Sequence, residues 1–491
     1  MEIIILVIYF LSLCILFSFG IHGLILVYFY RKTLKNRREK PEMQTDVPMV
    51  TIQLPMFNEY SVVERLIRAV CKIKYPIDKL EIQVLDDSTD DTITLANKVV
   101  DEYKAKGYNI KYIHRIDRSG YKAGALKAGL EVAEGEFVAI FDADFVPNED
   151  FLEETVPYFQ NPNIGLVQTR WEHLNEDYSM ITKAQALALD AHFCVEQQTR
   201  SNADFFFSFN GTAGIWRKAT IIDAGNWQAD TLTEDLDLSY RAQLKGWKFI
   251  YLNEITSPAE LPQDINSLKI QQFRWTKGAV ETAIKLIPRI FKERKKLTLG
   301  QKLESFAHLT SNIVFPFIIL TALLNIPVVF IKNHYSGVDT FYSLMSIFVF
   351  ATIATFIFYT YGQKTIHADW RKRLLLFPVF MAGSMGMAVN NSKAIFEAFI
   401  GKKSAFVRTP KTGSAPATAT TKKYFSKLKV SSVVVVELLF ALYFLFGIGL
   451  SIYYLEIAAI PFQIMFLAGF GSIGILSLKN AFKMRREAKL I

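Results

Sequence analysis

The fold is decided by an apolar strand that ends in two carboxylates, Phe137-Val138-Ala139-Ile140-Phe141-Asp142-Ala143-Asp144-Phe145. Three further apolar runs precede it, at Met49–Leu54, Leu80–Leu85 and Ile110–Ile113. Helical periodicity separates the runs, over Tyr60–Ile73, Asp91–Lys106 and Lys122–Ala133. This alternation predicts a mostly parallel sheet with crossover helices, in an α/β domain from Pro41 to about Leu297.

Two acidic pairs follow strands of this predicted sheet. Asp86 and Asp87 come directly after one strand, and Asp142 and Asp144 end another. Ligands of such sheets bind outside the carboxyl ends of the strands, so both pairs should meet at one crevice, where they could hold a divalent cation. Taken alone, an Asp-x-Asp is often a solvated turn, and Asp86–Asp91 could be only a helix cap. The convergence of two pairs favours a functional site.

A third acidic group lies at the start of a predicted helix, at Glu234 and Asp235. Thr233 could cap this helix, and the acids could simply favour its positive end. Capping explains one acid but leaves three carboxylates in four residues without a strong reason. In a dry crevice one of them could accept the proton of a sugar hydroxyl. We predict that Asp235 is this base, with Glu234 next in line.

Basic and aromatic residues complete the predicted site. Lys122 lies near the amino end of a helix, where an anionic diphosphate binds well, although its stretch could be merely a loop entering that helix. Arg274 offers a fork that suits phosphate, and Trp275 offers a flat face for a sugar ring. These residue types together indicate an enzyme that acts on a nucleotide-activated sugar.

The composition indicates a membrane part beside this domain. The 491 residues are 51% hydrophobic and include 40 Phe. Three scattered cysteines favour neither a disulfide framework nor a zinc site. The net charge of +9 arises mainly from Lys and Arg beside apolar segments, which fits the positive-inside rule better than a nucleic-acid partner.

Five apolar segments are long enough to span a bilayer: Ile3–Tyr30, Ile313–Ile331, Phe341–Tyr361, Val433–Tyr454 and Ile457–Leu478. A sixth, Leu374–Val389, is interrupted by Pro and Gly. If it crossed, the basic stretch Lys402–Lys429 would lie outside, against the charge rule. We therefore expect an interfacial or re-entrant helix there, with the catalytic domain and the basic tail in the cytosol.

Four quoted runs resemble glycosyltransferase family 2, and within it the cellulose-synthase-like enzymes. They are Ile82–Asp90, Gly120–Lys127, Phe141–Phe145 and Phe209–Arg217. The nearest likeness is to the plant cellulose-synthase-like A group, the glucomannan 4-beta-mannosyltransferases. The resemblance implies an α/β GT-A (Rossmann-like) cytosolic catalytic domain inserted in a polytopic α-helical membrane domain. The expected segments are a first transmembrane helix (1–30), the GT-A domain with its final interfacial helices (41–297), two spans (305–361), an interfacial helix with a gating segment (374–411), two spans (431–478) and a basic tail (479–491).

The family also implies roles for single residues. The nucleotide would contact Glu59, Asp86, Asp87, Lys122, Asp142 and Arg274. Asp142 and Asp144 would hold Mg²⁺ or Mn²⁺ on the diphosphate, and Asp235 would be the base. The acceptor would contact Phe209, Asn210, Gly211, Gln271 and Trp275. The spacing Gln-x-x-Arg-Trp at 271–275 is associated with processive members.

Phe406-Val407-Arg408-Thr409-Pro410-Lys411 is similar to the gating loop Phe-x-Val-Thr-x-Lys of cellulose synthases, which caps the active site. Phe406, Thr409 and Lys411 would be its gating residues. Arg408 replaces the usual Val, so the detailed contacts should differ. The alternative is a basic juxtamembrane linker without a gating role.

The expected function is that of an inverting, processive glycosyltransferase in the cell (inner or plasma) membrane. It would polymerise a β-linked mannan, glucomannan or glucan, with β-1,4 linkage expected, from GDP-mannose or UDP-glucose, and secrete it. Its partners would be the nucleotide sugar, the growing polysaccharide, the bilayer and an accessory export subunit, with no nucleic acid. The alternative is a transferase that adds one sugar to a lipid, like ceramide glucosyltransferases. A transporter without chemistry would not need the acidic sites.

Overall fold

A seven-stranded sheet forms the centre of the catalytic domain in the computed structural model, which describes residues 1–35, 39–43, 45–293, 297–409 and 432–488. The strand order is β3-β2-β1-β4-β6-β5-β7, and β6 is antiparallel to both of its neighbours. The strands are β1 (Val50–Met56), β2 (Leu80–Asp86), β3 (Asn109–His114), β4 (Phe137–Ile140), β5 (Ile164–His173), β6 (Gly214–Arg217) and β7 (Lys248–Ala259). The mostly parallel α/β sheet expected from the sequence is confirmed, and the four predicted strands are β1 to β4.

Helices cover both faces of the sheet and bury two separate cores. Along β4, Phe137 and Ala139 join one core, while Val138 and Ile140 join the other, because successive side chains of a strand point to opposite faces. The covering helices of the domain are α2 (Val63–Val70), α3 (Thr92–Ala105), α4 (Tyr121–Glu131), α5 (Phe151–Thr155), α6 (Met180–Ala191), α7 (Gln198–Asn202), α8 (Lys218–Asp223) and α9 (Glu234–Lys245). This two-sided burial fixes the carboxyl ends of β1, β2 and β4 along one edge.

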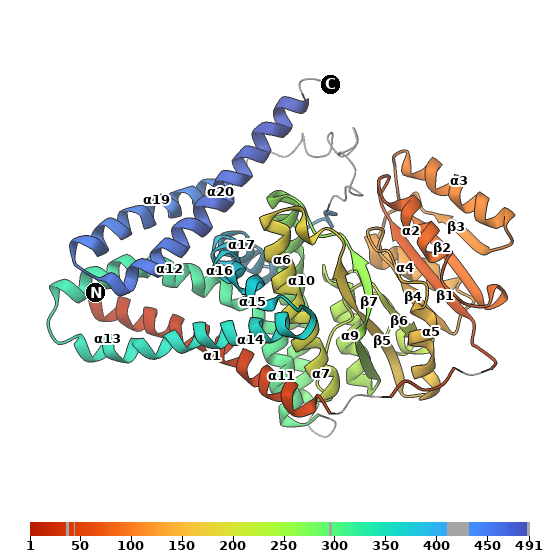
Figure 1. Cartoon of the computed structure of the whole chain (residues 1–491), viewed down its shortest axis with the longest axis horizontal. Helices are drawn as coiled ribbons and strands as arrows, with labels where there is room; N and C mark the ends of the chain where they lie inside the picture. Colours follow the sequence, from red (N-terminus) through yellow and green to blue (C-terminus); the bar gives the residue numbers. More distant parts are fainter. Residues whose placement is uncertain (36–38, 44, 294–296, 410–431, 489–491) are drawn as a thin grey trace.

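In the part of the chain that the structure describes, five helical segments are long and apolar enough to cross a membrane, as the sequence predicted. Most of their length lies at the left of Figure 1, away from the sheet at the right. They comprise α1 (Glu2–Thr33), α11 and α12 (Leu299–Thr310 and Val314–His334), α13 and α14 (Asp339–Met345 and Val349–Ile366), α19 (Ser432–Tyr453) and α20 (Ile460–Ala488). Together with the sheet, these helices indicate a multi-pass membrane protein that carries an α/β domain.

The ambiguous segment is helical but bent. α15 (Trp370–Arg373) leads into α16 (Phe377–Gly386), and α17 (Ala388–Phe399) follows at an angle of 42°. α16 packs against α20 and α6, and α17 packs against α10 and α12. The absence of a side chain at Gly386 allows this packing, because a Cβ there would lie 2.4 Å from the carbonyl oxygen of Gly469 in α20. A bent pair fits either a re-entrant element or a broken span, so the expectation that this segment does not cross stays a prediction.

A long helix, α10 (Ile265–Lys292), joins the catalytic domain to the membrane helices. It begins at Asp264, whose side chain accepts hydrogen bonds from the backbone N–H groups of Asn266 and Ser267. Lys269 donates to Glu437 of α19 at 2.7 Å and to Ser477 of α20 at 2.8 Å, so the helix is anchored to the last hairpin. This anchored helix carries the predicted Gln-x-x-Arg-Trp residues.

Candidate active site

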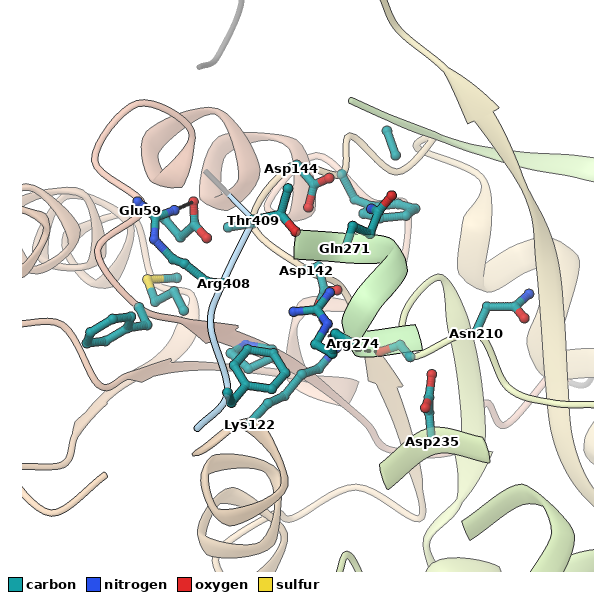
Figure 2. Close-up of a pocket in the computed structure, with 18 of the residues that line it drawn as sticks. Glu59, Lys122, Asp142, Asp144, Asn210, Asp235, Gln271, Arg274, Arg408 and Thr409 are labelled. Carbon is teal, nitrogen blue, oxygen red and sulfur yellow. Dashed lines mark hydrogen bonds and ion pairs between the residues drawn. The ribbon is translucent and has the colours of Figure 1, made fainter. Parts of the chain in front are cut away.

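One cavity lies at the carboxyl ends of β1, β2 and β4 and is closed by α10 and by residues 406–409. Figure 2 shows Glu59 and Arg408 at one end of it, and Asn210 and Asp235 at the other. Most of the predicted site residues line this cavity, as the rule for parallel sheets requires. They are Glu59, Asp87, Lys122, Asp142, Asp144, Asn210, Gly211, Glu234, Asp235, Gln271, Arg274, Trp275, Phe406 and Thr409.

Three predicted residues are not part of this lining. The Asp86 carboxylate is fully buried and accepts hydrogen bonds from the Tyr112 hydroxyl at 2.6 Å and from the Ser88 backbone N–H at 2.8 Å. Phe209 is buried against Trp216, with ring centroids 5.5 Å apart. Asp86 and Phe209 therefore support the turns that carry their neighbours. Lys411 lies outside the described residues.

Lys122 connects the acidic pair to the acceptor end of the cavity. Its ammonium group donates to Asp142 Oδ1 at 2.5 Å and to the Gly211 carbonyl at 2.9 Å. Burial disfavours the ammonium form, but the carboxylates of Asp142 and Glu234 outweigh it and raise the pKa of Lys122. Lys122 thus places a positive charge inside the cavity, between Asp142 and Gly211.

Asp235 lies at the first turn of α9. Its Oδ1 accepts a hydrogen bond from the Leu236 N–H at 2.8 Å. Burial and the neighbouring Glu234 carboxylate raise the pKa of Asp235 to about 7, although Lys122 acts in the opposite direction. Gly211 makes room for it, because a Cβ at Gly211 would lie 2.9 Å from Asp235 Oδ2. The carboxyl group is therefore suited to accept a proton near neutral pH.

The helix that carries Asp235 is not capped by Thr233, so this alternative from the sequence is wrong. The Thr233 side chain makes no capping hydrogen bond and lies 3.3 Å from the Thr282 hydroxyl of α10. α10 approaches closely here, because Gly278 packs directly on Thr233. The turn that presents Asp235 is thus fixed by α10 and not by a local cap. The other capping alternative is partly met, since Asp90 accepts from the Thr92 N–H at 3.0 Å.

The acidic pair could bind a divalent cation whose coordination is completed by oxygens of a bound ligand. Asp142 and Asp144 both line the cavity, and Asp144 is 6% exposed. Within the described ranges, no group of three or more His, Cys, Asp or Glu residues could hold a metal ion by itself. Hard cations prefer oxygen ligands, which the carboxylates and the oxygens of a diphosphate would supply together.

Aromatic rings line the cavity beside the acidic groups. The Trp275 ring lies 6.5 Å from Trp171 of β5, measured between ring centroids. Asn210 accepts a hydrogen bond from Gln197 at 2.8 Å, while its Nδ2 is buried with no partner among the described residues. Flat rings next to an unsatisfied amide donor suit a sugar, which presents both a flat apolar face and hydroxyls.

Residues 402–409 run into the cavity. The Phe406 ring stacks on Tyr121 at 5.9 Å, and the Arg274 guanidinium lies 4.5 Å from its centroid. Arg408, which replaces the usual Val, forms an ion pair with Glu59 at 2.7 Å. The segment therefore covers two residues that were predicted to bind nucleotide.

Several residues of the site were missed. Arg115 holds both oxygens of Asp87, at 2.8 and 2.6 Å, and Arg118 lies 3.4 Å from the Phe57 ring centroid. Arg115 lies two residues after the predicted strand Ile110–Ile113, so the rule that located the acidic pairs could have found it. Trp171 lies on β5, and Glu260 follows directly after the end of β7. Neither strand was predicted from the sequence, and no local signal marked the two residues.

Comparisons with known proteins agree with this geometry. The model of a family described as "Glycosyltransferase like family 2" matches residues 48–278. The chain is 38% identical to glucomannan 4-beta-mannosyltransferase 9 of Arabidopsis thaliana, over 87% of this chain and 81% of that enzyme. It is 41% identical to the probable glucomannan 4-beta-mannosyltransferase 10 of the same plant, over 67% of this chain and 63% of that enzyme.

A solved structure shows the same fold. It is a mannosyltransferase from Pyrobaculum calidifontis in complex with GDP-Man and Mn²⁺, with a TM-score of 0.55 and 17% identity, covering 81% of this chain and all of that one. The catalytic domain thus has the expected GT-A fold. The extent of the match to the plant enzymes shows that the chain is a glycosyltransferase, and that it belongs to glycosyltransferase family 2, among the cellulose-synthase-like enzymes.

Proposed function

We propose that the protein is an inverting, processive mannosyltransferase that uses GDP-mannose to build a β-1,4-linked mannan or glucomannan at the membrane. One observation carries this proposal. The acidic pair, the raised-pKa Asp235 and the rings of Trp171 and Trp275 line a single cavity that α10 joins to the membrane helices. The names of the plant relatives and the GDP-Man in the neighbouring structure support mannose as the sugar.

The chemistry follows from the positions of the side chains. An acceptor hydroxyl lies on the aromatic side of the cavity and gives its proton to Asp235 as its oxygen attacks the anomeric carbon. The bond from that carbon to the diphosphate breaks at the opposite face, so the configuration inverts and GDP leaves. Lys122 and Arg274 stabilise the negative charge on the leaving diphosphate.

Asp142 and Asp144 would hold the cation, Mg²⁺ or Mn²⁺. When bound, it would neutralise charge on the diphosphate. Lys122 orients the Asp142 carboxylate before the nucleotide arrives, because the two groups are 2.5 Å apart. The remaining nucleotide contacts fall to Glu59 and Asp87 at the far end of the cavity.

Residues 402–409 act in this proposal as a gate. The Phe406 ring covers the Arg274 guanidinium, and Arg408 forms an ion pair with Glu59. A nucleotide that binds Arg274 and Glu59 must therefore displace Phe406 and Arg408. Lys277 of α10 holds the base of the segment through Ser404 at 2.5 Å and through the Lys402 carbonyl. The cytosolic position of the catalytic domain remains part of the proposal on the charge argument. The cell membrane and an accessory export subunit stay predictions from the sequence.

The test is to incubate membranes with labelled GDP-mannose or UDP-glucose, then size the product and digest it. The proposal predicts a long product from GDP-mannose that a β-1,4-mannanase degrades and an organic solvent does not extract. A product made only from UDP-glucose would contradict GDP-mannose as the donor. A single labelled sugar in the lipid extract would instead favour the lipid-glycosylating alternative.

A further inference from the structure

A histidine with no assigned role faces the same cavity. His173 is the last residue of β5, two positions after Trp171, so both side chains lie on one face of the strand. Both line the cavity, and the His173 side chain is only 5% exposed. Its partner across the sheet is Ala259 of β7, which also lines the cavity. His173 therefore belongs to the wall that carries the aromatic rings.

One edge of this imidazole is fixed by a buried carboxylate. His173 Nε2 lies 3.2 Å from Asp190 Oδ1 of α6, and Asp190 is 2% exposed. The other oxygen of Asp190 accepts from Gln363 at 2.9 Å and lies 2.9 Å from His367 Nε2. Burial raises the pKa of Asp190, but these histidine contacts outweigh it and hold that pKa below its usual range. The carboxylate is thus ionised and can only accept.

An ionised Asp190 selects the tautomer of His173. Because Asp190 accepts, Nε2 carries the hydrogen, and in the neutral ring Nδ1 is left with a lone pair. The two ring nitrogens point in widely different directions, so Nδ1 points away from Asp190. Nδ1 has no hydrogen-bond partner within the ranges that the structure describes, and the ring borders the cavity. The site therefore holds one oriented hydrogen-bond acceptor beside Trp171 and Trp275.

We infer that His173 is an acceptor-binding residue, whose Nδ1 accepts a hydrogen bond from a hydroxyl of the sugar chain held against these rings, with Asp190 as its positioning residue. The inference rests on the proposed function. A nucleotide role is disfavoured because the Asp190 network joins β5 to α14, towards the membrane helices that a growing chain would meet.

Two isosteric variants separate this role from a structural one. In His173→Asn the side-chain amide reaches about as far as Nδ1, so it keeps a hydrogen-bond acceptor towards the cavity but loses the hydrogen bond to Asp190. In His173→Gln the side-chain amide reaches about as far as Nε2, so it keeps the hydrogen bond to Asp190 but loses the acceptor towards the cavity. His367→Ala is the control, because His367 contacts the same carboxylate without lining the cavity.

The readouts are the KM for added β-1,4-mannohexaose, the product length, the rate of donor hydrolysis in the absence of acceptor, and the melting temperature. We expect His173→Gln to raise the acceptor KM about tenfold, as for the loss of one hydrogen bond worth about 1.4 kcal/mol, and to shorten the product. His367→Ala should stay near the wild type in acceptor KM, and His173→Asn should fall between the wild type and His173→Gln, because its amide keeps an acceptor but is no longer positioned by Asp190. Donor hydrolysis should be unchanged in all three.

The reverse order, with His173→Gln near normal and His173→Asn impaired, would assign His173 a purely structural role. An equal loss in His367→Ala and His173→Gln would do the same. These outcomes are distinct from failure of the proposed function, in which the wild type itself would make no polymer and mannohexaose would not stimulate it.

Discussion

At the scale of single residues, the proposed base Asp235 should decide whether transfer occurs. Asp235→Asn keeps the acceptor for the Leu236 N–H but cannot take a proton, so it should bind nucleotide normally and lose turnover by about 10²- to 10⁴-fold. In the wild type, the pKa of about 7 means that the base is protonated at lower pH. The kcat/KM should therefore be highest above pH 7 and fall below it. A profile that stays flat from pH 5 to 8 would place the base elsewhere, with Glu234 next.

The acidic pair, Asp142 and Asp144, should set a dependence on a divalent cation. Asp144→Ala should abolish turnover, because the diphosphate leaves poorly without charge neutralisation. A chelator should do the same to the wild type, and Mn²⁺ or Mg²⁺ should restore it. Asp101→Ala is the matched control, since that aspartate is 73% exposed on α3, and it should change nothing. Full turnover in chelator would remove the cation from the account.

At the scale of elements, the contact between α10 and the Asp235 turn should not tolerate a methyl group. In Gly278→Ala the new Cβ would lie 2.5 Å from Thr233 Cγ2 and 2.8 Å from its backbone nitrogen, so the turn must move. We expect a loss of about 1–3 kcal/mol in stability and a larger loss of activity. Gly449→Ala in α19 meets nothing within 4 Å and serves as the control. Equal activity of the two variants, measured after purification, would show that α10 does not position the base.

The proposed gate, residues 402–409, can be tested through the ion pair of Arg408 with Glu59. Arg408→Val breaks the ion pair with Glu59, so the nucleotide no longer competes with Arg408, and the donor KM should fall about two- to fivefold. Glu59→Gln breaks the same pair but also removes the predicted nucleotide contact, so the donor KM should rise. If both variants raise the KM, Arg408 itself binds the nucleotide and the segment is not displaced.

The sequence predicted those parts that rest on local pattern. β1 to β4 were found because each is a bounded apolar run, and the acidic pairs follow because parallel strands end at one edge. β7 was missed because its apolar run ends near Leu252, while the strand itself continues through polar residues that resemble a loop. Asp190 and His367 are 177 positions apart, so no spacing rule could have joined them.

At the scale of the whole molecule, the charge argument predicts that residues 402–409 face the cytosol and that Ser336 lies outside. Single cysteines at Ser336 and Lys403, both exposed, can be introduced in a background without Cys14, Cys71 and Cys194. On intact cells an impermeant thiol reagent should label the first and not the second. Labelling of Lys403→Cys would mean that the bent pair α16 and α17 crosses, and would remove the gate.

The central claim is that one cavity both forms the glycosidic bond and retains the growing chain beside the membrane helices. The most direct measurement is the length of product made from labelled GDP-mannose by purified protein in inverted vesicles. The account predicts long, mannanase-sensitive chains even when few acceptors have reacted, enclosed within the vesicles, and shorter chains from Trp275→Ala with donor binding unchanged. Products that lengthen by one sugar at a time across all acceptors, or the same length in Trp275→Ala, would contradict it.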